Sequence, residues 1–143
     1  MFPRLVLGTA AVLFAGLGVL FAVAPHWTAA WVDIALPTNT ATIDFIATYG
    51  GFQLGFGVFL FTCLARPERV RLGLLASGYA VAGFGVTRAL GLLVLGGAKP
   101  VLYGALTFET LCATVAFVAA ARVPRGDEPF SGGSAPSQSR GAR

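Results

Sequence analysis

The sequence predicts an all-α fold, an integral membrane antiparallel four-helix bundle. Of its 143 residues, 56% are hydrophobic and 11% are charged, whereas soluble domains have about 25% charged residues. Four apolar windows lie at about 5–24, 45–65, 72–95 and 101–121. Each has the roughly 20 residues that a helix needs to cross the hydrocarbon core. The links between the last three windows are short, and a helix satisfies its own backbone in lipid, so antiparallel neighbours are the simplest arrangement.

Basic residues gather at one set of span ends, where they predict orientation. This set consists of Arg4, Arg66, Arg69, Arg71, Arg122, Arg125, Arg140 and Arg143. The opposite connections hold only Lys99, so the positive-inside rule predicts that both termini are cytoplasmic. Basic residues that collect at span ends, with Arg88 inside a span, do not form the diffuse basic coat of a nucleic-acid binder, so we expect no nucleic-acid partner. Nine Arg against one Lys, with abundant Ala and Gly, indicate a GC-rich bacterial genome and a multi-pass protein of the bacterial cytoplasmic (inner) membrane.

The first window resembles a signal peptide, because Arg4 precedes it and Ala22-Val23-Ala24 imitates a cleavage site. Its apolar run of about 20 residues is longer than the usual signal core. Pro25 directly after the site opposes cleavage there. We therefore interpret this window as the first membrane span.

The first external connection, residues 25–43, contains Trp27, Trp31 and Ile34 at helical spacing. This pattern predicts an interfacial helix in the headgroup region, where Trp is favoured. Two interpretations remain open: an aromatic anchor, or a lid over an outward-facing cavity.

The second span carries two polar residues on one face. We expect Asp44 to cap the start of this helix. Tyr49 and Gln53 then lie one turn apart, about 8 and 14 Å below Asp44 at 1.5 Å per residue.

Glycines predict where helices approach closely, because a missing side chain lets two backbones meet. Gly51 and Gly55 form a GxxxG motif in the second span, and Gly85 and Gly91 flank Arg88 in the third. The expected positions of structural close packing are Gly50, Gly51, Gly55, Gly85 and Gly91.

Two opposite charges lie inside the last two spans. Arg88 is about 10 Å from the external end of its span and Glu109 about 12 Å from the corresponding end of the next. A lone Arg at such depth costs about 3 kcal/mol on insertion scales, so we expect the two residues to pair. With Tyr49 and Gln53 they form a predicted ligand-binding layer in the outer half of the bundle. The alternative is that the pair only fixes helix register.

The remaining features predict no catalytic chemistry. Cys63 and Cys112 lie at different depths and form no CxxC motif, so we expect packing residues without a disulfide or bound metal. The chain contains no HExxH, P-loop or nucleophile elbow, and we assign it no catalytic residue and no cofactor. We expect residues 1–123 to form the transmembrane domain. The Gly, Ser and Pro-rich residues 124–143 predict a disordered cytoplasmic tail.

A combination of short motifs resembles a bacterial four-span membrane family catalogued only as a domain of unknown function. The motifs are YGGFQLGFGVFL at 49–60, RPERVRLGLL at 66–75, GFGVTRALGLL at 83–93, the GGAKP turn at 96–100 and Glu109. The resemblance covers roughly residues 40–121 and implies a four-helix topology. It also implies that the family's marked positions are Tyr49, Gly50, Gly51, Arg88 and Glu109. A remote similarity to DoxX-type membrane bundles rests on architecture alone and does not fix function.

We therefore expect an uncharacterised small membrane protein that binds at its polar layer. The expected partner is a membrane lipid, a quinone or other amphipathic small molecule, or a membrane-protein partner helix or second copy of the chain. One alternative is a membrane-embedded enzyme that uses Glu109 as general acid or base. Another is a subunit of a proton-coupled carrier.

Overall fold

The computed structural model describes residues 1–96 and 99–124, and all regular structure in this part of the chain is helical. Four helical runs are long and apolar enough to cross a membrane: Phe2–Val23, Asn39–Leu64, Pro67–Leu95 and Pro100–Ala121. The predicted all-α bundle with four spans is therefore confirmed. The predicted tail, apart from Pro124, lies outside the described residues.

The first span, α1 (Phe2–Val23), begins with a proline in its first turn and ends where Pro25 begins the short helix α2 (Pro25–Ala30). Proline cannot continue a helix because it lacks the amide proton and its ring collides with the preceding turn. Thr28 is buried in α2, and its hydroxyl donates hydrogen bonds to the carbonyls of Ala24 at 3.0 Å and Pro25 at 3.1 Å. The expected helix in the first connection is present, but it is short.

The second span is built from α3 (Asn39–Phe45), the π-helical turn η1 (Ile46–Gly51) and α4 (Phe52–Leu64). Thr38 caps the start, because its hydroxyl accepts a hydrogen bond from the amide of Ala41 at 3.2 Å. The expectation that Asp44 caps this helix was wrong. An earlier capping hydroxyl starts the helix sooner, and Asp44 lies exposed near the end of α3.

Few residues separate the second span from the third, and the third from the fourth. A 3-10 turn, η2 (Pro67–Arg69), leads into α5 (Val70–Leu95), and α6 (Pro100–Ala121) follows. Gly96 ends α5 with φ +63°, a backbone conformation that side chains disfavour. Pro100 in the first turn of α6 then sets the start of the last helix.

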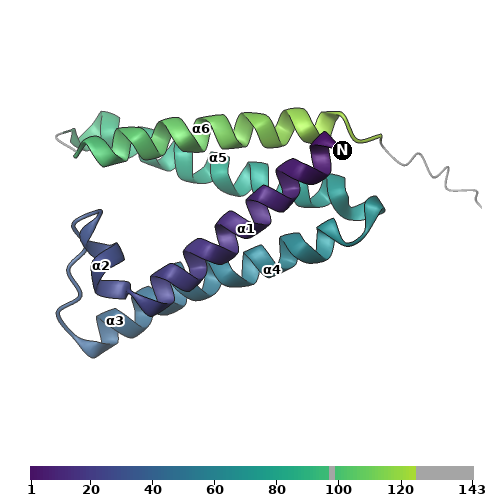
Figure 1. Cartoon of the computed structure of the whole chain (residues 1–143). Helices are drawn as coiled ribbons and strands as arrows, with labels where there is room; N and C mark the ends of the chain where they lie inside the picture. Colours follow the sequence, from purple (N-terminus) through teal and green to yellow (C-terminus); the bar gives the residue numbers. More distant parts are fainter. Residues whose placement is uncertain (97–98, 125–143) are drawn as a thin grey trace, which may run out of the picture.

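The four long helices form two pairs that diverge (Figure 1). Helix α1 packs along α4, and α5 packs along α6. The pairs meet at the end that holds the N-terminus, the α4–α5 connection and the end of α6, and they separate toward α2. We call these the narrow end and the wide end. The buried core lies at the narrow end and consists of Leu7, Ala11, Leu60, Cys63, Val70, Leu74, Ala119 and Ala120.

Small residues bring the backbones of α1 and α4 into close contact. A Cβ atom added to Gly57 would lie 2.5 Å from the backbone nitrogen of Ala15, and one added to Gly18 would overlap the backbone of Leu54. In the same way, a Cβ atom added to Gly50 would lie 3.1 Å from the Cβ of Ala22. The packed glycines of the second span, Gly50 and Gly57, are therefore seven residues apart, or two turns.

The predicted close-packing glycines divide into two groups. Gly50 lies against α1, and a Cβ on Gly85 would be 3.6 Å from the Cβ of Glu109. Within the described chain, Gly51 meets only a carbonyl of its own helix, and Gly55 and Gly91 meet nothing within 4 Å. The expected packing of Gly51 and Gly55 was wrong, because the face of the second span turned toward α1 carries Gly50 and Gly57 instead of the GxxxG motif. Gly91 lies on α5, and a Cβ there would meet no other described residue, so its expected packing was wrong as well.

Candidate functional site: a polar layer in an apolar cleft

The two helix pairs enclose a cleft of about 970 Å³. All four spans contribute to its lining, as do α2 and the loop that follows it. Most lining side chains are apolar, with a few polar groups among them. This volume and chemistry are typical of sites that bind small molecules.

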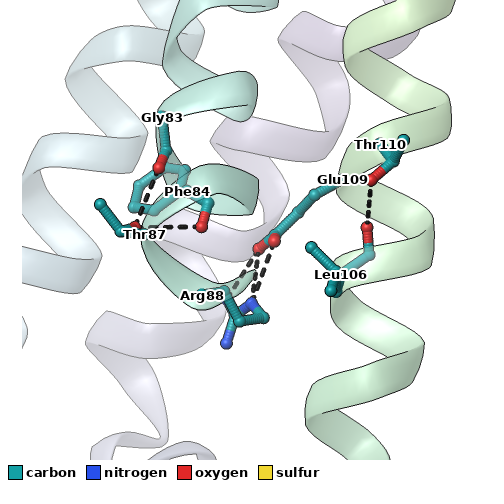
Figure 2. Close-up of polar contacts among 7 residues, drawn as sticks. All are labelled: Gly83, Phe84, Thr87, Arg88, Leu106, Glu109 and Thr110. Atoms are coloured by element: carbon teal, nitrogen blue, oxygen red, sulfur yellow. Dashed lines mark hydrogen bonds and ion pairs between the residues drawn. The ribbon is translucent and has the colours of Figure 1, made fainter. Parts of the chain in front are cut away.

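Arg88 and Glu109 form an ion pair on the cleft wall (Figure 2). The guanidinium Nε donates to Oε2 at 3.0 Å and to Oε1 at 3.2 Å, and Nη2 donates to Oε1 at 2.7 Å. The predicted pairing of these residues at a common level is therefore confirmed. The side chains are 26% and 13% exposed, respectively, so both are largely removed from the surface.

The geometry of this pair follows from a flat guanidinium meeting a flat carboxylate. Such a fork gives charge-assisted hydrogen bonds with a defined orientation, which a lysine could not reproduce. Gly85 lies one turn from Arg88 and packs against Glu109, since a Cβ added to it would be 3.6 Å from the Glu109 Cβ. Each charge thus offsets the cost of holding the other away from water.

One end of the Arg88 guanidinium makes no hydrogen bond with Glu109, and Arg88 is among the residues that line the cleft. Figure 2 shows a terminal nitrogen directed away from the Glu109 carboxylate. Nη1 donates no hydrogen bond to any residue in the described part of the chain, because the contacts to Glu109 use Nε and Nη2. Its N–H groups are available to an acceptor oxygen.

The hydroxyls beside this pair in sequence belong to other faces of their helices. Thr87 donates to the carbonyls of Gly83 at 2.9 Å and Phe84 at 3.1 Å, and Thr110 donates to that of Leu106 at 2.8 Å (Figure 2). Both threonines satisfy their own helix backbone. They take no part in the ion pair.

Tyr49 and Gln53 line the same cleft as the ion pair, although neither forms a hydrogen bond with Arg88 or Glu109. The cleft therefore collects all four predicted ligand-binding residues. Tyr49 lies in η1, and a π-helical turn accommodates one residue more than an α-helical turn. This extra residue rotates the downstream helix by roughly 100° relative to a regular α-helix.

An aromatic cluster that was not predicted lies at the wide end of the cleft. Ring centroids are 4.7 Å apart for Phe45 and Tyr49, 5.8 Å for Phe21 and Phe45, and 6.5 Å for Phe21 and Trp31. All four residues line the cleft. The contact between Phe45 and Tyr49 is predictable from their helical spacing of four residues. The contact of both with Phe21 is not, because Phe21 lies on another helix and no sequence pattern relates the two segments.

The segment after α2 contributes to the cleft and to its closure. Trp31, Val32 and Ile34 line the cleft, whereas Trp27 does not and is 60% exposed. Trp27 and Trp31 do lie side by side, with ring centroids 4.6 Å apart. The prediction that Ile34 continues the same helical face was wrong, because α2 ends at Ala30 and Asp33 adopts φ +58°.

An exposed ion pair joins the two helix pairs at the wide end. Lys99 Nζ lies 2.5 Å from Asp33 Oδ1, so the loop after α2 is tied to the residue before α6. This contact and the lining residues give the segment the position of a lid.

Cys63 and Cys112 are free thiols, buried and partly buried respectively. The expectation that they form no disulfide is confirmed. Across residues 1–96 and 99–124, no group of three or more His, Cys, Asp or Glu side chains could hold a metal ion.

Four apolar helices and an intramembrane ion pair facing a cleft define the class of protein: a multi-pass helical membrane protein. The chain belongs to the family described as Domain of unknown function (DUF4345), whose model matches residues 2–120. The predicted membership in a family of unknown function is thus confirmed. No curated protein and no solved structure matched the chain.

Proposed function

We propose that this protein binds one amphipathic membrane molecule, a lipid or a quinone, in the cleft between its helix pairs. The observation that carries the proposal is the arrangement of polar groups in this cleft. Tyr49, Gln53, Arg88 and Glu109 all line a space that is otherwise mostly apolar. Intramembrane ionisable residues are expensive, and they mark functional sites often enough to favour such a role.

The proposed ligand lies with its polar head at Arg88 and its tail toward the narrow end. Cleft residues nearer that end include Leu13 of α1 and Val115 of α6, which offer only apolar surface. An apolar tail matches this wall, because it makes van der Waals contacts there without burying an unpaired polar group. The divergence of the helix pairs in Figure 1 supports entry from the wide end.

The size of the cleft favours a small molecule over a partner helix. A helix about 10 Å wide and 30 Å long occupies roughly 2,400 Å³. The cleft holds about 970 Å³. A second helix would therefore have to lie across the opening instead of inside it.

Binding is also favoured over acid-base or proton-carrying roles for Glu109. Both of its carboxylate oxygens accept hydrogen bonds from Arg88, so the intact pair occupies the atoms that would have to exchange a proton. If Glu109 exchanged protons during a reaction or transport cycle, this pair would have to break in each cycle. A turnover or proton-flux signal lost in Glu109→Gln would support those roles instead.

We also propose an orientation: the protein lies in the inner membrane of a bacterium, with its narrow end and both termini on the cytoplasmic side. The arginines of the described chain support this orientation: Arg4, Arg66, Arg69, Arg71 and Arg122 all lie at the narrow end, next to span ends. Cytoplasmic loops carry such an excess. Residues 124–143 would then form a cytoplasmic tail.

Native mass spectrometry of the protein extracted in mild detergent tests the binding proposal. We expect a co-purifying lipophilic molecule in the wild type and a loss of at least about ten-fold in occupancy for Ala105→Phe, which fills the cleft; this corresponds to about 1.4 kcal/mol. Val101→Phe is the matched control, because Val101 lies on the same helix, is exposed and does not line the cleft. Equal occupancy in both variants, or an empty wild-type protein, would contradict the proposal.

A further inference from the structure

We infer that the head of the bound molecule is a neutral, planar, carbonyl-bearing ring, the chemistry of an isoprenoid quinone, and not an anionic lipid headgroup. This inference rests on the proposed binding function and names the class of ligand for the same cleft. Three independent features of the cleft lead to it: its net charge, its free hydrogen-bond donor and its aromatic wall.

The first feature is that the cleft carries no net charge. Among the described residues that line it, Arg88 is the one cation and Glu109 the one anion, and they neutralise each other. Lys99 does not line the cleft and is paired with Asp33. An anionic headgroup would add a negative charge without a partner in a region of low dielectric constant, which is strongly unfavourable. A neutral head adds none.

The second feature is an unused hydrogen-bond donor on a residue that lines the cleft. Nη1 of Arg88 donates to no described residue, while Nε and Nη2 are held by Glu109. A guanidinium has no acceptor, so its partner must supply an oxygen lone pair. A carbonyl oxygen meets this requirement without displacing Glu109. The phenol of Tyr49 and the amide of Gln53, both on the cleft wall, supply further donors.

The third feature is the aromatic cluster at the wide end. Phe45 and Tyr49 stack with an interplanar angle of 27° and a centroid distance of 4.7 Å, and Phe21 lies 6.0 Å from Tyr49. Planar rings prefer offset-stacked or edge-to-face contacts, worth about 0.5–1.5 kcal/mol beyond buried area. A conjugated ring gains these contacts. A flexible glycerol backbone, even one with neutral ester carbonyls, does not.

The two tryptophans provide a reporter for a quinone. Trp31 lines the cleft and Trp27 does not, and they are the only tryptophans in the sequence. In Trp27→Phe we expect decylubiquinone to quench the fluorescence of Trp31 saturably at micromolar concentration. In Trp31→Phe the quenching of Trp27 should be weaker, because its ring is outside the cleft. Dioleoylglycerol and phosphatidylglycerol should not displace decylubiquinone from Trp27→Phe at equal concentration.

A change of charge tests the neutral-head argument on the Trp27→Phe background. Glu109→Gln leaves Arg88 unpaired and gives the cleft a net charge of about +1, so phosphatidylglycerol should compete at least about ten-fold better. Arg88→Gln/Glu109→Gln restores zero charge and should remove this gain. If Glu109→Gln fails to fold, the doubly substituted protein and the reporter protein still decide the preference between the probes.

The outcomes separate the two proposals. If phosphatidylglycerol or dioleoylglycerol binds the reporter protein and decylubiquinone does not, the inference about the head is overturned while a binding function survives. If no probe saturates and the purified wild type carries no lipophilic molecule, both proposals fail. Saturable quinone binding that excludes the two lipids, with the predicted charge dependence, supports the inference.

Discussion

Arg88 and Glu109 stabilise each other in a layer where either charge alone would be costly. Their bidentate contact, with Nη2 at 2.7 Å from Oε1, sets the distance between α5 and α6 at this level. A Cβ added to Gly85 would be in ordinary van der Waals contact with Glu109, 3.6 Å from its Cβ, so the ion pair does not require glycine at this position. The chemistry at this site therefore depends on the charged pair itself.

Charge reversal at this pair gives a prediction at the residue scale. Arg88→Glu places two carboxylates together, and Glu109→Arg places two guanidinium groups together. Each single change should lower the free energy of unfolding by about 3–5 kcal/mol, the range for breaking a buried pair. The double reversal should recover at least half of the summed loss, because opposite charges face each other again.

Thermal unfolding of the four proteins in one detergent completes this double-mutant cycle. A double reversal whose loss equals the sum of the single losses would show that the mutual contact is not what stabilises the helices.

At the scale of elements, α1 and α4 form a contact made by small residues. Three contacts join these helices: Ala15 faces Gly57, Gly18 faces the Leu54 backbone, and Ala22 faces Gly50. Helices in lipid gain no hydrophobic free energy from association, so van der Waals contact between close backbones has to hold this pair together. The π-helical turn between α3 and α4 lies beside this contact. Within this turn Gly50 faces α1 and Tyr49 lines the cleft.

Two glycines two residues apart in α4 give a matched test of this contact. A Cβ at Gly57 would lie 2.5 Å from the Ala15 backbone, whereas one at Gly55 would meet nothing within 4 Å. Gly57→Ala should destabilise the protein by about 1–3 kcal/mol or more through overpacking. Gly55→Ala should leave stability unchanged or raise it by up to about 1 kcal/mol, because alanine favours the helix.

Chemical denaturation in mixed micelles measures both substitutions under the same conditions. Equal effects of the two alanines would contradict the assigned packing face.

The whole molecule is a wedge with a closed narrow end and an open wide end (Figure 1). The buried core fills the narrow end, and Arg122 adds a cation-π contact with the Phe2 ring at 4.9 Å. At the wide end, the segment after α2 and the exposed Asp33–Lys99 pair bridge the gap. An exposed pair of this kind contributes only about 0–1 kcal/mol, so this closure is much weaker than the core.

Reporter fusions test the orientation proposed for this wedge. With the narrow end in the cytoplasm, green fluorescent protein fused after Arg143 should be fluorescent, and alkaline phosphatase at that position should be inactive. Alkaline phosphatase fused after Thr38, in the connection between the first two spans, should be active because it is exported. The opposite pattern at both positions would reverse the proposed topology.

Local chemistry made much of this architecture predictable. The four spans follow from runs of apolar residues long enough for the bilayer, and the Arg88–Glu109 pair follows from two charges at equal depth on adjacent helices. The packing glycines were only partly predicted. The GxxxG motif at Gly51 and Gly55 is a local pattern, but the packing face depends on which helix lies opposite.

The sequence by itself determined the number of spans, the C-terminal ends of all four spans to within one residue, and the pairing of the two partly buried charges, because each depends on hydropathy, helical rise and charge balance. The helices of the second and third spans begin at Asn39 and Pro67, earlier than the predicted 45 and 72. The tertiary structure alone decided that the helix pairs diverge, that Phe21 and Trp31 join Tyr49 at the wide end, and that the segment after α2 lines the cleft. These features arise from contacts between residues far apart in the chain, and such contacts leave no periodic signal along a single helix.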